Sequence, residues 1–190
     1  MTPRKSASEE LTNERIMEAA RELFVEEGYQ LFSMRKLARK LNCSHGAIYH
    51  HFENKAALFY TLVEDGFSSL KAVLNQIERN VEKGEETIYE VLMGFIRFGL
   101  ENKRHYEIMF LFMDKELQTY EGDAPNLSYQ HFARVLRNSS RKIIQAKEVW
   151  SVFLALHGFV AHYCRREESF LDIEVLADSY VKILMKGINS

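Results

Sequence analysis

The sequence predicts an all-α protein, and three observations support this fold class. Its 190 residues include nine glycines and two prolines, about half the usual share of roughly 12 per cent, and many-stranded folds need these residues at their turns. Apolar residues recur at helical spacing in most segments of the chain. The content of 46% apolar and 27% charged residues supplies a core and argues against both disorder and a membrane protein.

The first predicted helix begins after an N-cap at Thr12 and ends at Gly28, because hydroxyl side chains favour helix starts and glycine favours helix ends. The face that it buries consists of apolar residues at positions i, i+3, i+4, i+7 and i+8, namely Ile16, Ala19, Ala20, Leu23 and Phe24.

Two short helices and one long helix are expected next. Ser33 caps the first of them, which ends where Asn42 can adopt the left-handed conformation. Ser44 caps the second, which runs to about His51. The long helix covers about residues 54–77, where apolar residues continue the helical spacing.

Five further helices bring the expected total to about nine. A polar hinge near residues 82–86 precedes them, and the region Tyr120–Pro125 reads as a loop because it contains glycine and proline. The five helices are expected at about residues 88–99, 106–113, 127–138, 146–166 and 173–187.

The net charge of −2 conceals one basic window. Between Gly28 and Phe52 the sequence has no Asp or Glu, and a polyanion could dock there. A solvated basic helix face is the alternative reading. The positively charged and titratable residues of this window are Arg35, Lys36, Arg39, Lys40, His45, His50 and His51.

The two short helices, separated by Asn42 and Cys43, predict a helix-turn-helix. An α-helix fits the major groove of B-DNA, and residues near its N-terminus can reach base edges. The second helix buries Ala47 and Ile48 and is expected to expose His45, Gly46, Tyr49 and His50.

Several motifs combine across residues 12–65. They are IMEAARELF from Ile16, Gly28-Tyr29, MRKLARKL from Met34, GAIYHHF from Gly46 and NKAAL from Asn54. In this register the segment closely resembles the TetR family of bacterial transcriptional regulators, of the TetR/AcrR type. The resemblance implies a helix-turn-helix DNA-binding domain at residues 1–55 and an effector-binding and dimerisation domain at residues 56–190.

The resemblance also implies roles for single residues. Arg35 and His45 would read base edges, and Gly46 would let the helix approach the groove closely. The residues expected at the DNA backbone or at the start of the recognition helix are Ser33, Ser44, Tyr49, His50 and Lys55. Cys43 and Ala56 depart from the usual pattern, and neither changes the assignment.

The C-terminal half resembles a ligand domain with a Trp…His-Gly helix, through Trp150 and Leu156-His157-Gly158, and through the aromatic–Met–Phe run that starts at His105. Aromatic and methionine side chains there could line an effector pocket or simply fill the core, and His157 could equally be a hydrogen-bonded core residue. The candidate pocket residues are Phe95, Phe98, Met109, Phe110, Met113, Trp150, Phe153 and His157.

The segment Val149–Cys164 has no formal charge and is more apolar than one core requires. Together with the last helix it could form a four-helix interface with a second copy, and the alternative is that both helices pack within one chain. The candidate interface residues are Ala155, Gly158, Ala161, Ile173, Leu176, Tyr180, Ile183 and Leu184.

Other classes of function find less support. The sequence has no GxSxG, Walker, HExxH or Rossmann motif, so we expect no enzyme and no cofactor. His157, His162 and Cys164 do not share a helix face, so no metal site is predicted. Residues 1–11 lack the apolar run of a signal peptide. Two unpaired cysteines favour a cytoplasmic protein.

The predicted function is that of a homodimeric repressor that binds a palindromic operator in double-stranded DNA and is released by a small apolar or aromatic effector. An activator, or a ligand-independent regulator acting through a protein partner, is the alternative reading. An enzyme or carrier that uses the C-terminal half is a third possibility, which the missing catalytic motifs disfavour.

Overall fold

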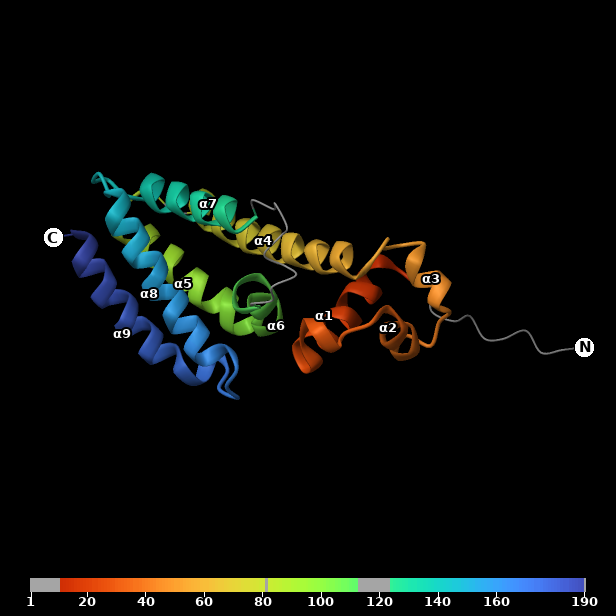
Figure 1. Ribbon diagram of the computed structural model, residues 1–190. Helices are drawn as coiled ribbons and strands as arrows, with labels where there is room; N and C mark the ends of the chain where they lie inside the picture. Colours follow the sequence, from red (N-terminus) through yellow and green to blue (C-terminus); the bar gives the residue numbers. More distant parts are fainter. Residues whose placement is uncertain (1–10, 81, 113–123, 190) are drawn as a thin grey trace, which may run out of the picture. The chain divides into compact units, whose positions relative to one another are not determined.

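The computed structural model describes residues 11–80, 82–112 and 124–189. Helices joined by loops and turns make up this part of the chain, which confirms the predicted all-α class (Figure 1). The chain divides into two compact units, Met1–Leu62 and Val63–Ser190. None of the helices in the described ranges combines the length and the apolar composition of a membrane span.

The first unit contains α1 (Asn13–Leu31), α2 (Met34–Lys40), α3 (His45–Tyr49) and the start of α4 (Lys55–Asn80). All three predicted hydroxyl caps are confirmed. The side chains of Thr12, Ser33 and Ser44 accept hydrogen bonds from the backbone N–H three residues further along, which satisfies donors that the first helical turn leaves free.

Gly28 interrupts α1, as the sequence predicted, although a short helical turn continues to Leu31. Its φ of 80° lies in the left-handed region, which only glycine adopts at little cost. The kink brings Phe32 back onto Phe24, and the two ring centroids lie 3.9 Å apart. Ile16, Phe24 and Ile48 are fully buried in the core of this unit.

The second unit holds the rest of α4 and six further helical segments. They are α5 (Glu85–Glu101), α6 (Lys103–Tyr106), the π-helical turn η1 (Glu107–Leu111), α7 (Ala124–Ser139), α8 (Ala146–Cys164) and α9 (Phe170–Asn189). α5 packs against α7, α8 and α9 (Figure 1). Its side chain Phe95 lies 5.6 Å from Phe132 of α7 and 5.8 Å from Phe153 of α8, between ring centroids.

Several predicted boundaries differ from those in the structure. The helix expected at residues 106–113 starts at Lys103 and then widens, because the N–H of Phe112 bonds to the carbonyl of Glu107 five residues back. Pro125 lies within the first turn of α7 instead of in a loop, since proline is tolerated where its missing N–H has no helical partner. The remainder of the predicted loop, 120–123, lies outside the described residues.

The last helix begins at Phe170, three residues earlier than predicted. Ser169 and Asp172 exchange hydrogen bonds across this start, with the Asp172 carboxylate accepting from the Ser169 N–H at 2.7 Å. This reciprocal arrangement is a capping box, and it fixes where α9 begins.

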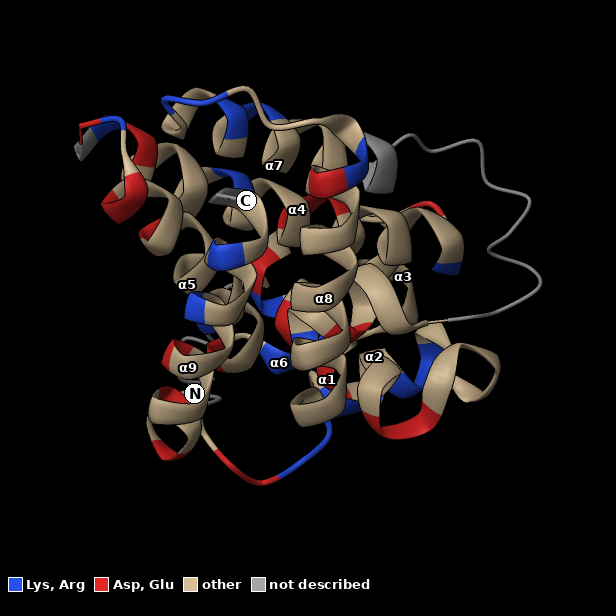
Figure 2. Cartoon of the chain, turned by 90° about the vertical axis from the view of Figure 1, so that its left-hand side faces the viewer, with Lys and Arg blue, Asp and Glu red and all other residues tan. Residues whose placement is uncertain are grey.

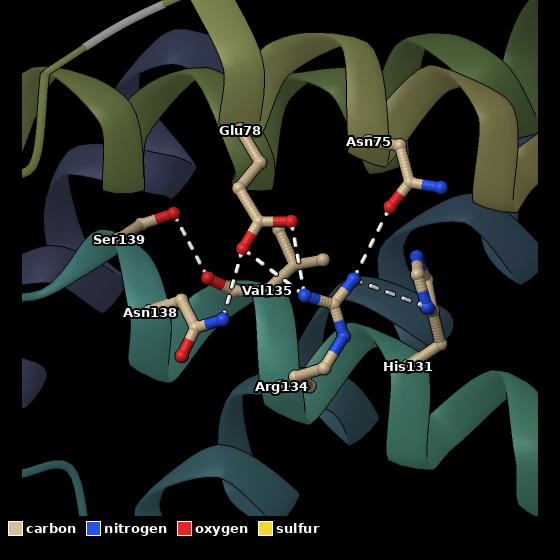
Figure 3. Close-up of polar contacts among 7 residues, drawn as sticks. All are labelled: Asn75, Glu78, His131, Arg134, Val135, Asn138 and Ser139. Carbon is tan, nitrogen blue, oxygen red and sulfur yellow. Dashed lines mark hydrogen bonds and ion pairs between the residues drawn. The ribbon is translucent and has the colours of Figure 1, made fainter.

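A polar network joins α4 to α7 (Figure 3). Arg134 donates from one nitrogen to both carboxylate oxygens of Glu78 at 3.1 Å and from the other to Asn75 at 3.2 Å. Asn138 donates to Glu78 at 3.0 Å. Partial burial works to raise the pKa of Glu78, and the bonds from Asn138 and Arg134 outweigh it and hold that pKa below its ordinary value.

Candidate nucleic-acid interface and effector site

The turn between α2 and α3 has helix-turn-helix geometry. Asn42 adopts a φ of 52°, the left-handed conformation predicted for it. The N–H of Cys43 then bonds to the carbonyl of Ala38 at 3.0 Å, which closes the end of α2. α3 begins two residues later, so the two short helices contact each other across a tight turn.

α3 places the predicted recognition residues on one exposed face. Ser44, His45, Gly46, Tyr49 and His50 are exposed, while Ile48 is fully buried and anchors the helix. Gly46 has open space around the position of a Cβ, so its own domain does not require glycine there. The close approach of a helix to a DNA groove would require it.

The rings of His45 and Tyr49 touch edge to face, with centroids 4.8 Å apart. These residues were predicted to read a base and to contact a phosphate, respectively. Their contact on the surface of α3 means that the position of each ring depends on the other.

The basic residues of α2 fall into two groups. Lys36 binds the carboxylate of Glu27 at 2.7 Å, and Lys40 binds that of Glu22 at 3.0 Å, both on α1. Arg35 and Arg39 are exposed, one turn apart on the same helix. Arg35 is a predicted base-reading residue. Arg39 stands out only once the ion pairs of Lys36 and Lys40 are known, because the charge pattern of the sequence does not distinguish it from these two lysines.

The remaining predicted DNA contacts lie near the start of α4 and α2. The ammonium of Lys55 sits 3.9 Å from the ring centroid of Tyr29, and this cation–π contact positions the side chain. Ser33 uses its oxygen as a helix cap and keeps its O–H free to donate. His51 is tied to Asn13 on α1, with its Nδ1 2.5 Å from the amide oxygen.

The second unit gathers the predicted effector residues around one polar pair. The hydroxyl of Tyr106 lies 2.7 Å from Nδ1 of His157, and Tyr106 is fully buried. The ring of Phe110 lies 4.7 Å from that of Tyr106 and 5.4 Å from that of His157, between centroids. Phe153 stacks nearly parallel to His157 at 6.5 Å.

Burial shifts both members of the polar pair toward their neutral forms. It lowers the pKa of His157 and raises that of Tyr106 well above its ordinary value, with the Cys164 thiol adding to the second effect. Tyr106 was not among the predicted site residues. The need of a buried tyrosine O–H for a partner was the signal that could have identified it.

The other predicted pocket residues are less closely grouped. Phe95 and Phe98 are buried in the core of the unit. Met109 packs on α4, where a Cβ on Gly66 would lie 2.6 Å from its Cγ and Sδ, so this glycine permits a close approach. Trp150 is 46% exposed and lies 4.8 Å from Tyr129 and 5.8 Å from Phe153. Met113 lies outside the described residues.

The residues predicted for the dimer interface fall into an exposed group and a group that packs within its own chain. Leu176 and Ile183 are 48% and 61% exposed on α9. Gly158 is exposed on α8, and a Cβ there would meet no neighbour within 4 Å. Leu154, which was not predicted, is 47% exposed one turn earlier on the same helix. After its first turn α8 carries no Lys, Arg, Asp or Glu, as the colouring of Figure 2 shows.

Four of the remaining interface candidates are partly or fully engaged within their own chain. Ile173 is buried in the core. Tyr180 donates its hydroxyl to the carbonyl of Ala155 at 2.9 Å, and this bond joins α9 to α8. Leu184 packs against the core of the unit. Ala161 is half-buried.

The part of the chain that the structure describes contains no group of three or more metal-ligating side chains. Cys43 is half-buried in the first unit and Cys164 is buried in the second, and both are free thiols.

Comparison with known proteins places these features in a family context. Residues 16–61 match the family described as bacterial regulatory proteins, tetR family. An HTH-type transcriptional regulator of Staphylococcus aureus strain USA300 is 31% identical over 100 residues, which cover 53% of each chain. The chain thus spans about half the length of the curated relatives that it matches.

Solved structures resemble the fold over nearly the whole chain. The transcriptional regulator FadR from Bacillus subtilis, in complex with stearoyl-CoA, aligns with a TM-score of 0.75 at 16% identity and covers 93% of this chain and 100% of its own. A bacterial regulatory protein in the tetR family from Rhodococcus RHA1 aligns with a TM-score of 0.73 at 18% identity, covering 97% and 98%.

The fold and the exposed α2–α3 motif define a helix-turn-helix domain joined to a helical second domain. The predicted resemblance is confirmed, and the chain has the N-terminal domain and the fold of the TetR/AcrR-type regulators. The Staphylococcus aureus relative is named as an HTH-type transcriptional regulator, and the Rhodococcus neighbour as a regulatory protein of the tetR family.

Proposed function

We propose that the chain is a cytoplasmic transcriptional repressor that binds a palindromic operator as a homodimer and is released by a small apolar or aromatic effector. The observation that carries the DNA-binding part of this proposal is the exposed face of α3, which presents His45, Gly46 and Tyr49. Arg35 is exposed on the neighbouring helix α2. This combination provides both base-edge and phosphate contacts.

The charge distribution of the first unit supports this assignment. Carboxylates of α1 neutralise the charges of Lys36 and Lys40. Arg35 and Arg39 are exposed and keep the surface of α2 basic. Arginine also presents two parallel donors, which match the paired acceptors of guanine and the oxygens of phosphate. Binding to DNA would then weaken steeply with salt as counterions are released.

The exposed apolar residues on α8 and α9 support dimerisation. Leu154, Leu176 and Ile183 expose about half or more of their surface, and Gly158 leaves room for a neighbouring helix. A glycine inside a helix costs about 1 kcal/mol relative to alanine, so close packing by a second copy would explain its presence. Two recognition helices are needed to read half-sites about 34–36 Å apart.

The aromatic cluster around His157 is the proposed effector site. Its rings provide an apolar environment, and the flexible Met109 can adjust to a bound molecule. FadR, which shares the fold, was solved with stearoyl-CoA, so this architecture can hold a ligand with a long apolar chain. An effector that binds more tightly to a conformer whose recognition helices are wrongly spaced for DNA would weaken DNA binding. The size of the loss is set by the difference between the effector's affinities for the two conformers.

A fluorescence-anisotropy titration with labelled duplexes from the DNA flanking the protein's own gene tests the proposal. The wild type should bind one duplex at least about 10³-fold more tightly than a scrambled duplex at the same salt concentration. Tyr49→Ala should weaken binding to both duplexes, because phosphate contacts carry no sequence information. Val175→Ala, at a highly exposed position of α9, is the control and should bind both duplexes as the wild type does. Equal affinity for all duplexes would contradict the proposal.

A further inference from the structure

The pair formed by Tyr106 and His157 leaves one hydrogen-bonding atom free. The Tyr106 hydroxyl contacts Nδ1 of the imidazole at 2.7 Å. The other ring nitrogen, Nε2, has no partner among the described residues, and it is not among their fully enclosed polar atoms. His157 is half-buried between the rings of Phe110 and Phe153, so Nε2 is the polar atom that this aromatic cluster offers to a ligand.

The buried hydroxyl determines which nitrogen of His157 carries the proton. Tyr106 is 0% exposed, and a buried O–H group must donate to an acceptor. Within the described part of the chain, Nδ1 is the acceptor within reach of this hydroxyl. Nδ1 therefore accepts, and the neutral ring carries its proton on Nε2. The cluster thus presents one N–H donor.

Among the described residues, no charged side chain is hydrogen-bonded or ion-paired to His157. Burial lowers the pKa of His157, and no charged group of the described residues contributes to that shift. The nearest buried carboxylate along η1, Glu107, is bound to the guanidinium of Arg165 at 2.6 Å. A cationic ligand would find no counter-charge beside His157, and a hydrocarbon would leave the N–H without a partner.

We infer that the effector is an uncharged apolar or aromatic molecule with one hydrogen-bond acceptor, of the ketone, ester or thioester class, which accepts from Nε2–H of His157. Tyr106 is the positioning residue, since it holds the imidazole in the donating tautomer. This inference rests on the proposed effector site and adds the chemical class of the ligand.

Three naphthalene probes of similar size test the class by equilibrium dialysis against the full chain. 2-Acetonaphthalene has a carbonyl acceptor, 2-ethylnaphthalene has none, and 2-naphthylmethylammonium is a cation. The ketone should bind about fivefold more tightly than the hydrocarbon, the value of one ordinary hydrogen bond. The cation should bind most weakly.

Variants of His157 separate hydrogen bonding from packing. His157→Phe should abolish the preference for the ketone and keep hydrocarbon affinity within about twofold, and His157→Gln, which retains an N–H donor, should restore part of the preference. In the wild type, ¹⁵N chemical shifts should show the Nε2–H tautomer, and Tyr106→Phe should give a mixture. This readout does not depend on any ligand.

The outcomes distinguish this inference from the proposed function. Equal binding of ketone and hydrocarbon, tightest binding of the cation, a ketone preference that survives in His157→Phe, or an Nδ1–H tautomer would overturn the ligand class and leave the effector site standing. Failure of every probe to bind the wild type would contradict the effector site itself, and the inference with it.

Discussion

The ammonium group of Lys36 lies 2.7 Å from the carboxylate of Glu27, so one of the cations on α2 is directed back to α1. The same nitrogen donates to the carbonyl of Leu31 at 3.0 Å. Arg35, the preceding residue, is exposed. Two neighbouring basic residues of identical charge therefore have different expected roles, structural for Lys36 and DNA-binding for Arg35.

Arg35→Ala should weaken binding to the preferred duplex by about 1–3 kcal/mol and relax the base preference at one position of each half-site. Lys36→Ala, the matched control, should change DNA affinity little and lower the stability of the first unit instead. Anisotropy titrations and denaturant unfolding measure the two effects. The assignment would be wrong if Lys36→Ala caused the larger loss of affinity.

The contact between His45 and Tyr49 should appear as coupling. Because the rings touch at 4.8 Å, the free-energy costs of His45→Ala and Tyr49→Ala for DNA binding should fail to add, by about 0.5–1.5 kcal/mol. A double-mutant cycle on the preferred duplex measures the difference. Strict additivity would show that the two side chains act independently on DNA.

Ile183→Glu should convert the dimer to a monomer, since a charge placed at a buried apolar contact has no partner. Ile183 is 61% exposed on the isolated chain, so the substitution should leave the fold intact. Val175→Glu is the control, because Val175 is 85% exposed on α9 and lies about 100° around the helix from Leu176. Analytical ultracentrifugation measures both. If Val175→Glu were monomeric and Ile183→Glu remained dimeric, the proposed interface would be wrong.

Glu78→Gln should lower the free energy of unfolding at neutral pH by about 0.2–1 kcal/mol, the range for solvent-accessible ion pairs. The folded protein lowers the pKa of Glu78 below its ordinary value of 4.5. Its contribution is therefore complete above pH 4.5 and disappears as the pH falls through the folded value. Denaturant unfolding from pH 3 to 7 measures this. Glu64→Gln, at an exposed position of the same helix, is the matched control for the loss of one carboxylate.

The two cysteines should differ in reactivity toward a thiol reagent. Burial, together with the nearby carboxylate of Glu107, raises the pKa of the Cys164 thiol to about 11, so little thiolate forms at pH 8. Cys43 is half-buried in the turn before α3 and should react first. The protein's preferred DNA duplex should protect Cys43 from the thiol reagent, and a scrambled duplex should not. Cys43→Ser should remove the fast phase of labelling.

Local signals in the sequence predicted the first unit well. Thr12, Ser33 and Ser44 were recognised as caps because a side-chain oxygen at a helix start acts within three residues. The exposed face of α3 followed from the burial of Ile48. The partners of Lys36 and Lys40 could not be predicted, since Glu27 and Glu22 reach them only after α1 has packed on α2.

The second unit depends more on contacts that are distant in sequence. Tyr106 and His157 are 51 residues apart and meet only because α6 and α8 pack together. The burial of Ile173 likewise follows from how α9 lies on the core, which helical periodicity alone leaves undetermined. The widening of η1 has no signal that we can identify in its residues.

The most direct test of the central claim, that α3 reads DNA from a dimer, is selection from a library of random duplexes. The wild type should enrich one palindrome whose half-site centres lie about 34–36 Å apart, and the double variant Arg35→Ala, Tyr49→Ala should enrich nothing. Enrichment of an unpaired site, or the same palindrome with the double variant, would contradict the account.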